Sequence, residues 1–280
     1  MDAVILLNKP AGMTSFDAVA KCRRIFHERK IGHTGTLDPE ASGLMIILLG
    51  KYTKLLPYCV KNHKAYQATL KLGEMTDTED IWGTIINTKT PSIHTKAEID
   101  NAVQSLTGDI LQVPPMYSAL KKDGKKLYEY ARQGIEIERE ARPVHISTLK
   151  VEKINDTNYR MNAVVSSGTY IRTLITDFGK QLDELAIMSS LIRTKIEHLS
   201  LKDACTFEDL ESGVSFLSPI QVIDPTYKIV ETDRVVDIKN GKRIKLDIRD
   251  PQVIFTSNGE LLAAYALQED GLYHCLRGLF

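Results

Sequence analysis

Apolar residues along the chain recur with two periods, which predict a mixture of strands and helices. Apolar runs or alternating positions, which favour strands, occupy residues 4–7, 44–49, 64–73 and two segments after residue 144. Three amphipathic helices are predicted around the following apolar sets: Ala18, Cys22, Ile25 and Phe26; Ile99, Ala102, Val103 and Leu106; Leu174, Ile175, Phe178 and Leu182. Ser15 is expected to cap the first helix, and Thr95 with Glu98 forms a capping box before the second.

The C-terminal part of the chain shows only short apolar segments. Between residues 226 and 280 we expect strands at Val235–Val236, 253–255 and 261–265. The triplet at 257–259, Ser-Asn-Gly, is a typical hairpin turn. This pattern predicts a small β domain at the end of the chain.

Composition excludes several classes of protein. No apolar run is long enough for a transmembrane helix, and the N-terminal residues do not resemble a secretion signal. The four cysteines are scattered without metal-ligand spacing, so we expect no metal, no disulfide and a cytoplasmic location. Formal net charge is +0, which argues weakly against nucleic acid. However, residues 1–64 hold ten Lys and Arg against five Asp and Glu, so a basic patch can still bind phosphate.

The segment 32–45, Gly-His-Thr-Gly-Thr-Leu-Asp-Pro-Glu-Ala-Ser-Gly-Leu-Met, is rich in glycine and hydroxyl residues and predicts a loop. Asp38 precedes Pro39, which disfavours a helical backbone at the carboxylate. From these residues alone, a turn in which Asp38 bonds nearby backbone N–H groups is as reasonable as a functional carboxylate.

The same segment closely resembles the active-site motif of the TruB family of tRNA pseudouridine synthases. The resemblance implies that Asp38 is the catalytic carboxylate. The residues 8–15, Asn-Lys-Pro-Ala-Gly-Met-Thr-Ser, are similar to the first family motif, which packs against the catalytic loop. The resemblance is strong over about residues 3–213, with separate elements in the family's order.

Further family elements imply roles for five more residues. Tyr66 resembles the tyrosine that stacks on the target base and can act as a base, and Asp80 resembles the aspartate that interacts with the catalytic arginine. In the element Ser-Gly-Thr-Tyr-Ile-Arg-Thr, Tyr170 would pack by the base and Arg172 would pair with the catalytic carboxylate. Leu191 would line the base pocket, although Ile192 replaces an arginine that is usual in that element.

Two further features concern RNA contact. His33 could occupy the stack vacated by a flipped base, although a loop histidine bonded to backbone is the simpler interpretation without the resemblance. The segment around 113–143 interleaves lysines with tyrosines, a combination that suits phosphates and stacked bases. It is very similar to an insertion that grips RNA in bacterial members of the family. Its candidate phosphate contacts are Lys121, Lys122, Lys125 and Lys126.

For the whole chain the resemblance implies an α+β fold with a mixed, largely antiparallel sheet, flanking helices and a small C-terminal PUA-like β domain. We expect a catalytic domain over 1–222 and the β domain over 223–280. The implied reaction is isomerisation of uridine-55 in the T loop of tRNA to pseudouridine, with flipping of the base. We expect no cofactor, no obligate protein partner, no membrane association and a monomer.

Other functions remain open at this level. A guide-RNA-dependent synthase of the Cbf5/dyskerin type is disfavoured by the bacterial-type insertion and the short C-terminal tail. A non-catalytic tRNA-binding or folding chaperone is disfavoured because Asp38, Tyr66 and Arg172 are all present. A glycoside hydrolase would need a second carboxylate in the pocket. Asp38 itself has three possible roles, since it could attack the ribose, attack the base or deprotonate the sugar.

Overall fold

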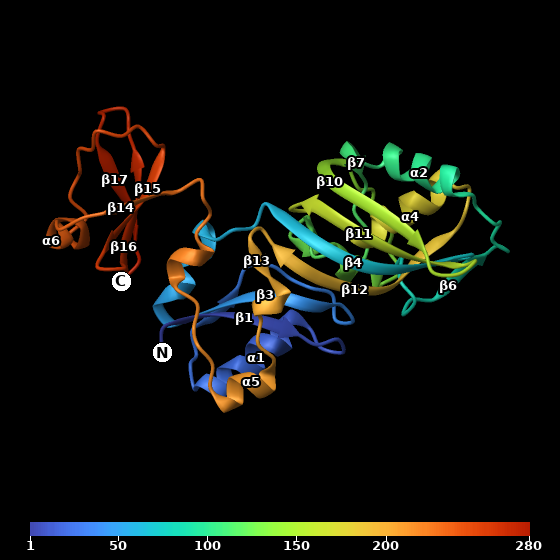
Figure 1. Cartoon of the computed structure of the whole chain (residues 1–280), viewed down its shortest axis with the longest axis horizontal. Coiled ribbons are helices and arrows are strands. Elements are labelled where there is room, and N and C mark those ends of the chain that lie inside the picture. The colour runs from blue at the N-terminus through green and yellow to red at the C-terminus, as the bar shows by residue number, and fades with distance from the viewer. The chain divides into compact units, whose positions relative to one another are not determined.

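The structure, a computed structural model, describes all 280 residues, and they form two compact units. The first unit comprises Met1–Pro39, Gly43–Lys61 and Leu201–Phe280, and the second comprises Glu40–Ser42 and Asn62–Ser200 (Figure 1). None of the helices is both long and apolar enough to span a bilayer.

The N-terminal part of the first unit is built on two apolar strands. β1 (Ala3–Lys9) pairs antiparallel with β3 (Ser42–Leu49), and β2 (Ile31–His33) also pairs antiparallel with β3. The side chains of β1 and β3 are nearly all buried, as expected of continuous apolar strands covered on both faces. Both strands were predicted from their apolar runs. The helical elements of this unit are α1 (Ser15–Phe26), η1 (Gly50–Tyr58), η2 (Leu201–Asp203), α5 (Phe207–Ser212), η3 (Pro219–Val222) and α6 (Val235–Lys239).

The predicted cap of α1 was wrong by one residue. Thr14 is the N-cap, and its hydroxyl accepts from the Asp17 N–H while the Asp17 carboxylate accepts from the Thr14 N–H. This is a full capping box with aspartate in place of the usual glutamate. Ser15 is therefore the first helical residue, and its hydroxyl is available for another partner.

The C-terminal part of the first unit forms a four-stranded sheet. β14 (Lys228–Glu231) lies parallel to β15 (Gln252–Ser257), and β16 (Glu260–Leu267) and β17 (Tyr273–Gly278) follow antiparallel. The predicted turn between β15 and β16 is confirmed, since Asn258 and Gly259 have φ of 49° and 77°. The predicted strand at Val235–Val236 was wrong, because α6 begins there. A pair of apolar residues cannot distinguish a short strand from a short helix.

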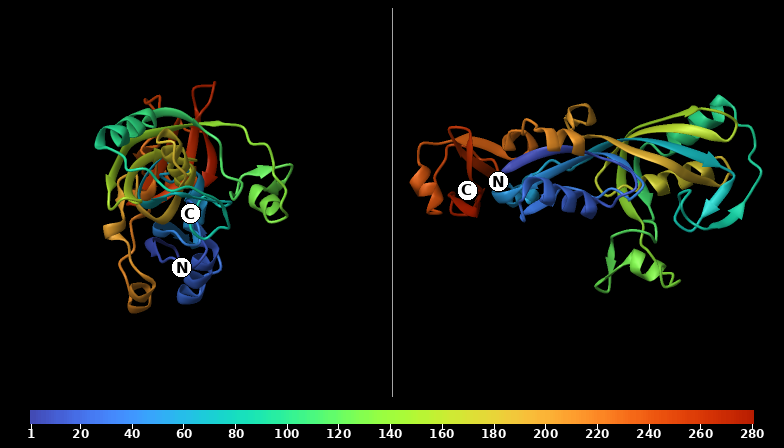
Figure 2. Two further views of the ribbon diagram at one scale, coloured as in Figure 1. Left: turned by 90° about the vertical axis from the view of Figure 1, so that its right-hand side faces the viewer. Right: turned by 90° about the horizontal axis from the view of Figure 1, so that it is seen from below.

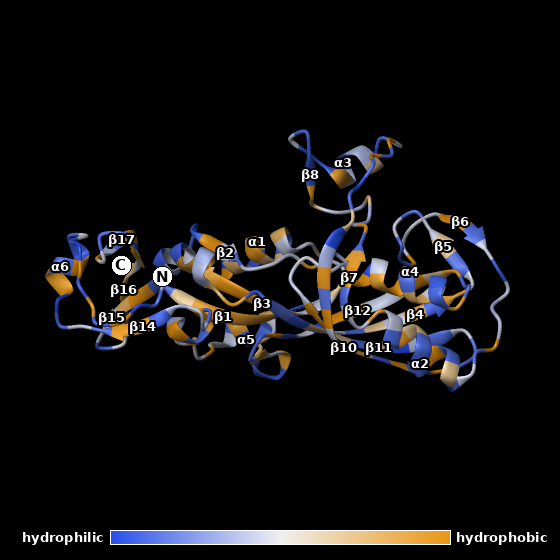
Figure 3. Cartoon of the chain, turned by 90° about the horizontal axis from the view of Figure 1, so that it is seen from above, coloured by the Kyte–Doolittle hydropathy of each residue, from blue (hydrophilic) through white to orange (hydrophobic).

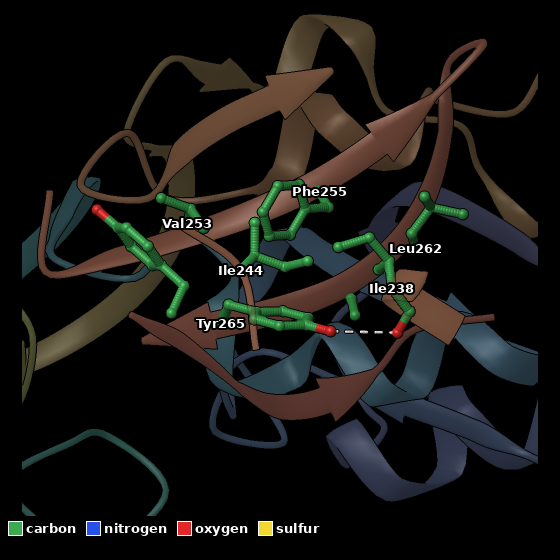
Figure 4. Close-up of a cluster of buried hydrophobic side chains, with 8 residues drawn as sticks. Ile238, Ile244, Val253, Phe255, Leu262 and Tyr265 are labelled. Atoms are coloured by element: carbon green, nitrogen blue, oxygen red, sulfur yellow. Dashed lines mark hydrogen bonds between the residues drawn. The ribbon is translucent and has the colours of Figure 1, made fainter. Parts of the chain in front are cut away.

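This sheet has a hydrophobic core of its own (Figure 4). The buried residues are Ile238, Ile244, Val253, Phe255, Leu262, Ala263, Tyr265 and Tyr273. Tyr265 donates its hydroxyl proton to the Ile238 carbonyl at 3.2 Å, and its ring meets Phe255 edge to face at 5.0 Å between centroids. The predicted domain boundary at residue 223 stays a prediction.

Phe255→Ala should strongly destabilise this sheet. The side chain is 1% exposed, so its removal leaves a cavity and should lower the free energy of unfolding by about 3–5 kcal/mol. Tyr265→Phe is the matched control, because it keeps the ring and loses only the neutral hydrogen bonds of the hydroxyl, each costing about 1 kcal/mol. Chemical denaturation followed by tyrosine fluorescence measures both. Equal effects of the two variants would contradict the assignment of Phe255 to the core.

The second unit is organised on an antiparallel sheet. Its strand order is β12-β4-β11-β10-β7, and neighbouring strands in this order are antiparallel. α4 packs on β12 and β4, and α2 packs on β10 and on α4, so the helices cover one face. The bounds of these elements are β4 (His63–Leu72), β7 (Gly108–Gln112), β10 (Arg142–Lys153), β11 (Asn158–Ser166), β12 (Ala186–Ile196), α2 (Lys96–Ser105) and α4 (Ile171–Gln181).

Several sequence predictions are confirmed in this unit. The alternating segment 64–73 is β4, and the two segments after residue 144 are β10 and β11. The Thr95–Glu98 capping box is present at the start of α2. The α+β class with a largely antiparallel sheet and a C-terminal β structure is also confirmed. Short additional strands are β5 (Glu74–Thr76), β6 (Ile85–Thr88) and β13 (Leu199–Ser200).

An insertion follows β7 and stands away from the sheet of the second unit, as the right-hand view of Figure 2 shows. It contains a hairpin of β8 (Lys121–Lys122) and β9 (Lys125–Lys126), followed by α3 (Leu127–Ala131). The two residues of the hairpin turn, Asp123 and Gly124, have φ of 52° and 82°, as a type I′ turn requires. β8 is among the hydrophilic segments of Figure 3.

Candidate active site

Asp38 lies on a short loop of the first unit that is fixed on both sides of the carboxylate. The predicted loop over 32–45 is shorter than expected, because β2 extends to His33 and β3 begins at Ser42. The Ser15 hydroxyl accepts from the Leu37 N–H at 2.8 Å and is 3.1 Å from the Leu37 carbonyl, to which it donates. The side chain of Asp38 is half-buried beside the buried Leu37.

The other side of Asp38 is held by a buried lysine. Lys9 is 0% exposed, and its ammonium donates to the carbonyls of Pro10, Met13 and Pro39 at 2.8, 2.7 and 3.1 Å. The Gly12 N–H also donates to the Pro39 carbonyl at 3.1 Å. A buried ammonium is tolerated only when its protons are satisfied, so these contacts tie the segment 8–15 firmly to the Asp38 loop.

In the second unit, Arg172 is a buried cation in the first turn of α4. It is 5% exposed and donates from Nη1 to the Thr78 carbonyl at 2.8 Å and from Nη2 to the Tyr117 carbonyl at 2.9 Å. An arginine in the first turn of a helix is unfavourable for the helix dipole, so these carbonyls, with their partial negative charge, compensate for its position. The two bonds also determine the plane of the guanidinium.

Asp80 is connected to Arg172 through the loop that carries it. The Asp80 Oδ1 accepts from the Thr78 hydroxyl at 2.6 Å and from the Trp82 N–H at 3.1 Å. Arg172 is bonded to the carbonyl of the same Thr78. Asp80 therefore orders the loop whose backbone receives the arginine.

Tyr170 is the N-cap of α4, and a residue that sequence patterns did not identify holds its backbone. Gln112 is 2% exposed; its amide oxygen accepts from the Tyr170 N–H at 2.8 Å and its amide N–H donates to the Tyr170 carbonyl at 3.1 Å. These two hydrogen bonds from Gln112, at the end of β7, align the start of α4. A single glutamine at the end of a strand has no sequence signal that distinguishes this role.

Tyr66 and Leu191 lie on the same face of the second unit's sheet. Leu191 of β12 is directly opposite Ala68 of β4, and Tyr66 is two residues before Ala68. Opposed residues and residues two apart share a face, so Tyr66 and Leu191 are diagonal neighbours. Tyr66 is half-buried and Leu191 is 7% exposed.

The four lysines of the insertion face each other across its hairpin. Lys121 is opposite Lys126, and Lys122 is opposite Lys125. Lys122 donates to the Glu138 carbonyl at 2.8 Å. The ammonium groups of Lys125 and Lys126 lie 5.1 and 5.3 Å from the ring centroids of Tyr130 and Tyr128, respectively. Like charges in opposed positions destabilise a hairpin, so this arrangement favours an anionic partner.

The structure thus groups the predicted residues within each unit. In the second unit, Tyr170, Arg172 and Asp80 are linked through Thr78 and the start of α4, and Tyr66 and Leu191 share a sheet face. Asp38 and His33 belong to the first unit. The pairing of Asp38 with Arg172 stays a prediction. No group of three or more His, Cys, Asp and Glu side chains is arranged to hold a metal ion.

Residues 23–171 match the sequence profile of the TruB family pseudouridylate synthases (N terminal domain). The chain belongs to this family and is a pseudouridine synthase, an isomerase.

The similarity to curated relatives extends over most of the chain. The tRNA pseudouridine synthase B of Oceanobacillus iheyensis is 40% identical over 280 residues, covering 95% of this chain and 92% of its own. That of Clostridium perfringens (strain SM101) is 48% identical over 249 residues, covering 87% and 85%. Among solved structures, a Cbf5-Nop10-Gar1 complex aligns with a TM-score of 0.71 at 24% identity, covering 99% of this chain and 85% of the other. That likeness concerns the fold alone.

Proposed function

We propose that this enzyme converts uridine-55 in the T loop of tRNA to pseudouridine, as a monomer and without a cofactor, a guide RNA or a protein partner. Relatives that span almost the whole chain are named tRNA pseudouridine synthase B, which supports tRNA as the substrate. All four cysteines are free thiols, which fits the reducing cytoplasm.

The observation that carries the proposal is the double anchoring of the Asp38 loop. Bonds from Ser15 and Lys9 hold the residues on both sides of Asp38, so the carboxylate is placed without being buried. Preorganisation of this kind is what a catalytic carboxylate needs, because no binding energy is then spent on ordering it.

The reaction needs no redox partner. The bond between uracil nitrogen 1 and ribose carbon 1′ breaks, the base turns, and carbon 5 forms the new bond to carbon 1′. The proton on carbon 5 leaves, and nitrogen 1 gains one, so atoms and electrons balance. In this proposal the Asp38 carboxylate acts on the ribose or the base, and Arg172 keeps that carboxylate ionised and aligned. Tyr66 stacks on the base and removes the carbon-5 proton.

A uridine within a folded loop must leave its stack to reach these groups, which costs a few kcal/mol. We infer that the base flips, with Tyr66 and Leu191 forming the surface that receives it and Tyr170 packing beside it. His33, at the end of β2, would take the vacated position in the RNA stack.

The insertion would bind the tRNA backbone. Replacing Lys121, Lys122, Lys125 and Lys126 together by alanine should weaken tRNA binding and reduce its salt dependence, because each lost phosphate contact lowers the log–log salt slope by about 0.7–0.9. The single-turnover rate at saturating tRNA should change much less. Affinity measured at several salt concentrations tests this. An unchanged slope would mean that these lysines only solvate the surface.

Three other functions are separated by one pair of measurements. Pseudouridine detected by carbodiimide and reverse transcription on an unmodified tRNA transcript, with no guide RNA present, would exclude a guide-dependent enzyme. It would also exclude a chaperone without catalysis. Free uracil in the product would instead indicate a glycoside hydrolase. Absence of pseudouridine at position 55 of the transcript would refute the proposed function.

A further inference from the structure

Glu79 is a half-buried carboxylate in the loop that carries Asp80. Its Oε2 accepts from the Thr173 hydroxyl at 2.8 Å. Burial raises the pKa of Glu79, while the Thr173 hydrogen bond and the nearby positive charge of Arg172 oppose that rise. Its backbone has φ of 64°, the left-handed region that a residue with a long side chain seldom adopts. A half-buried acid held in an unfavourable backbone conformation requires an explanation.

The loop is compact and is docked on the sheet through the backbone of Glu79. The Glu79 carbonyl accepts from the Met188 N–H at 3.0 Å, and the Ile81 N–H donates to the Met188 carbonyl at 2.9 Å. A Cβ at Gly83 would collide with the Thr78 hydroxyl, so the loop closes tightly on itself. The backbone of the loop is therefore held by β12, and the Glu79 side chain reaches α4 instead of bonding within the loop.

Two consecutive loop residues contact two consecutive residues of α4. Thr78 receives Arg172 on its carbonyl at 2.8 Å, and Glu79 receives Thr173 on its carboxylate at 2.8 Å. We propose that Glu79 is a positioning residue: its bond to Thr173 fixes the loop against the first turn of α4, and the Thr78 carbonyl then sets the guanidinium of Arg172. This inference rests on the proposed role of Arg172 in orienting Asp38.

The chemistry explains why such a contact would affect the rate. A guanidinium orients a carboxylate through a planar fork, so a small rotation or shift of Arg172 misaligns the pair. Misplacement of a catalytic group by about 1 Å can cost two orders of magnitude in rate. Glu79 touches neither reacting atom, so its loss should lower the rate constant and leave tRNA affinity unchanged.

Four substitutions separate the side-chain bond from the backbone conformation. Glu79→Gln keeps the reach and an acceptor oxygen, whereas Glu79→Asn suits the left-handed backbone but is one methylene too short. Thr173→Ser keeps the hydroxyl, and Thr173→Val keeps the shape without it. We expect Glu79→Asn and Thr173→Val each to lower the single-turnover rate at saturating tRNA about tenfold, with the dissociation constant within about twofold. Glu79→Gln and Thr173→Ser should stay within about threefold of the unmodified enzyme.

The variant that combines Glu79→Asn with Thr173→Val measures the energetic coupling between the two side chains. If the two side chains act only through their mutual bond, Glu79→Asn with Thr173→Val should be no slower than the slower single variant. Multiplied losses, a normal rate in Glu79→Asn, or a loss of tRNA affinity instead of rate would each overturn the proposal. Glu98→Ala serves as the stability control, since it removes a cap of α2 near the opposite end of α4. An equal rate loss in Glu98→Ala at matched Tm would also overturn it.

A second measurement does not need the RNA. Hydrogen exchange of the Arg172 Nη–H groups, which donate to the Thr78 and Tyr117 carbonyls, followed by NMR and assigned with Arg172→Lys, should be about tenfold faster in Glu79→Asn and unchanged in Glu79→Gln. Unchanged exchange in both variants would show that Glu79 does not hold Arg172. If the enzyme forms no pseudouridine at uridine-55, the proposed function fails, while the exchange result still decides the role of Glu79.

Discussion

Asp38→Asn should lower the rate of pseudouridine formation by at least about a thousandfold and leave tRNA affinity within about threefold. Asparagine has nearly the same shape, so the bonds of Ser15 and Lys9 to the residues on either side should persist. It lacks the negative charge that would act on the ribose or the base. Phosphate contacts, which supply most of the affinity for RNA, are unaffected by the change.

The measurement is a single-turnover assay on a tRNA transcript, with affinity measured in parallel by filter binding. Glu40→Gln is the matched control, because it neutralises a carboxylate two residues away in the same loop and should keep the full rate. Substantial turnover by Asp38→Asn would remove this carboxylate from the centre of the reaction. Retained binding without turnover would also show that tRNA binding by the protein does not require the chemistry.

Arg172→Lys should lower the rate about a hundredfold, although it keeps the charge. Arg172 uses two separate nitrogens to bond the Thr78 and Tyr117 carbonyls. A lysine ammonium is a single point that cannot satisfy both carbonyls and still present a planar fork to a carboxylate. Loss of one bond should also loosen the loop around Thr78.

Arg160→Lys, at an exposed position of β11, provides the control for a change from arginine to lysine on the same unit. It should leave the rate unchanged. Single-turnover rates of both variants, at tRNA concentrations well above the dissociation constant, decide the matter. Near-normal turnover of Arg172→Lys would mean that the charge alone is needed.

Sequence patterns predicted the helices and strands better than the hydrogen bonds that hold the candidate site residues. β1, β3, β4, β10, β11, α2 and α4 follow from apolar runs and periodicity, because burial of one face imposes these patterns. Asp38 and Arg172 were identified by resemblance to a family and not by any periodicity. The segment that holds the Asp38 loop was also expected from the resemblance, but the partners of Arg172 were not predicted, since Thr78 and Tyr117 contribute carbonyls that every residue type possesses.

Two local errors differ in their origin. Ser15 and Thr14 both have side chains that can cap a helix, and their hydrogen-bond partners decide between them. Thr14 bonds with Asp17 at the start of α1, whereas the Ser15 hydroxyl accepts from the Leu37 N–H. Val235 and Val236 have high strand propensity but lie in a short helix, because Ile238 of that helix packs in the core and its carbonyl accepts from the Tyr265 hydroxyl. The Thr14–Asp17 capping box is local and was present in the sequence, whereas the short helix at Val235 depends on tertiary contacts that a single sequence does not contain.

If the insertion binds RNA as proposed, its opposed lysines serve binding at the expense of the stability of the hairpin. The Asp123–Gly124 turn sets a register that places Lys121 against Lys126 and Lys122 against Lys125. Neutral residues at these positions would make the hairpin more stable. Random mutation of these lysines to neutral residues would therefore tend to raise the stability of the hairpin and to lower its affinity for RNA. Selection for tRNA binding would have to act continuously against that drift, which is the usual form of a trade-off between stability and activity.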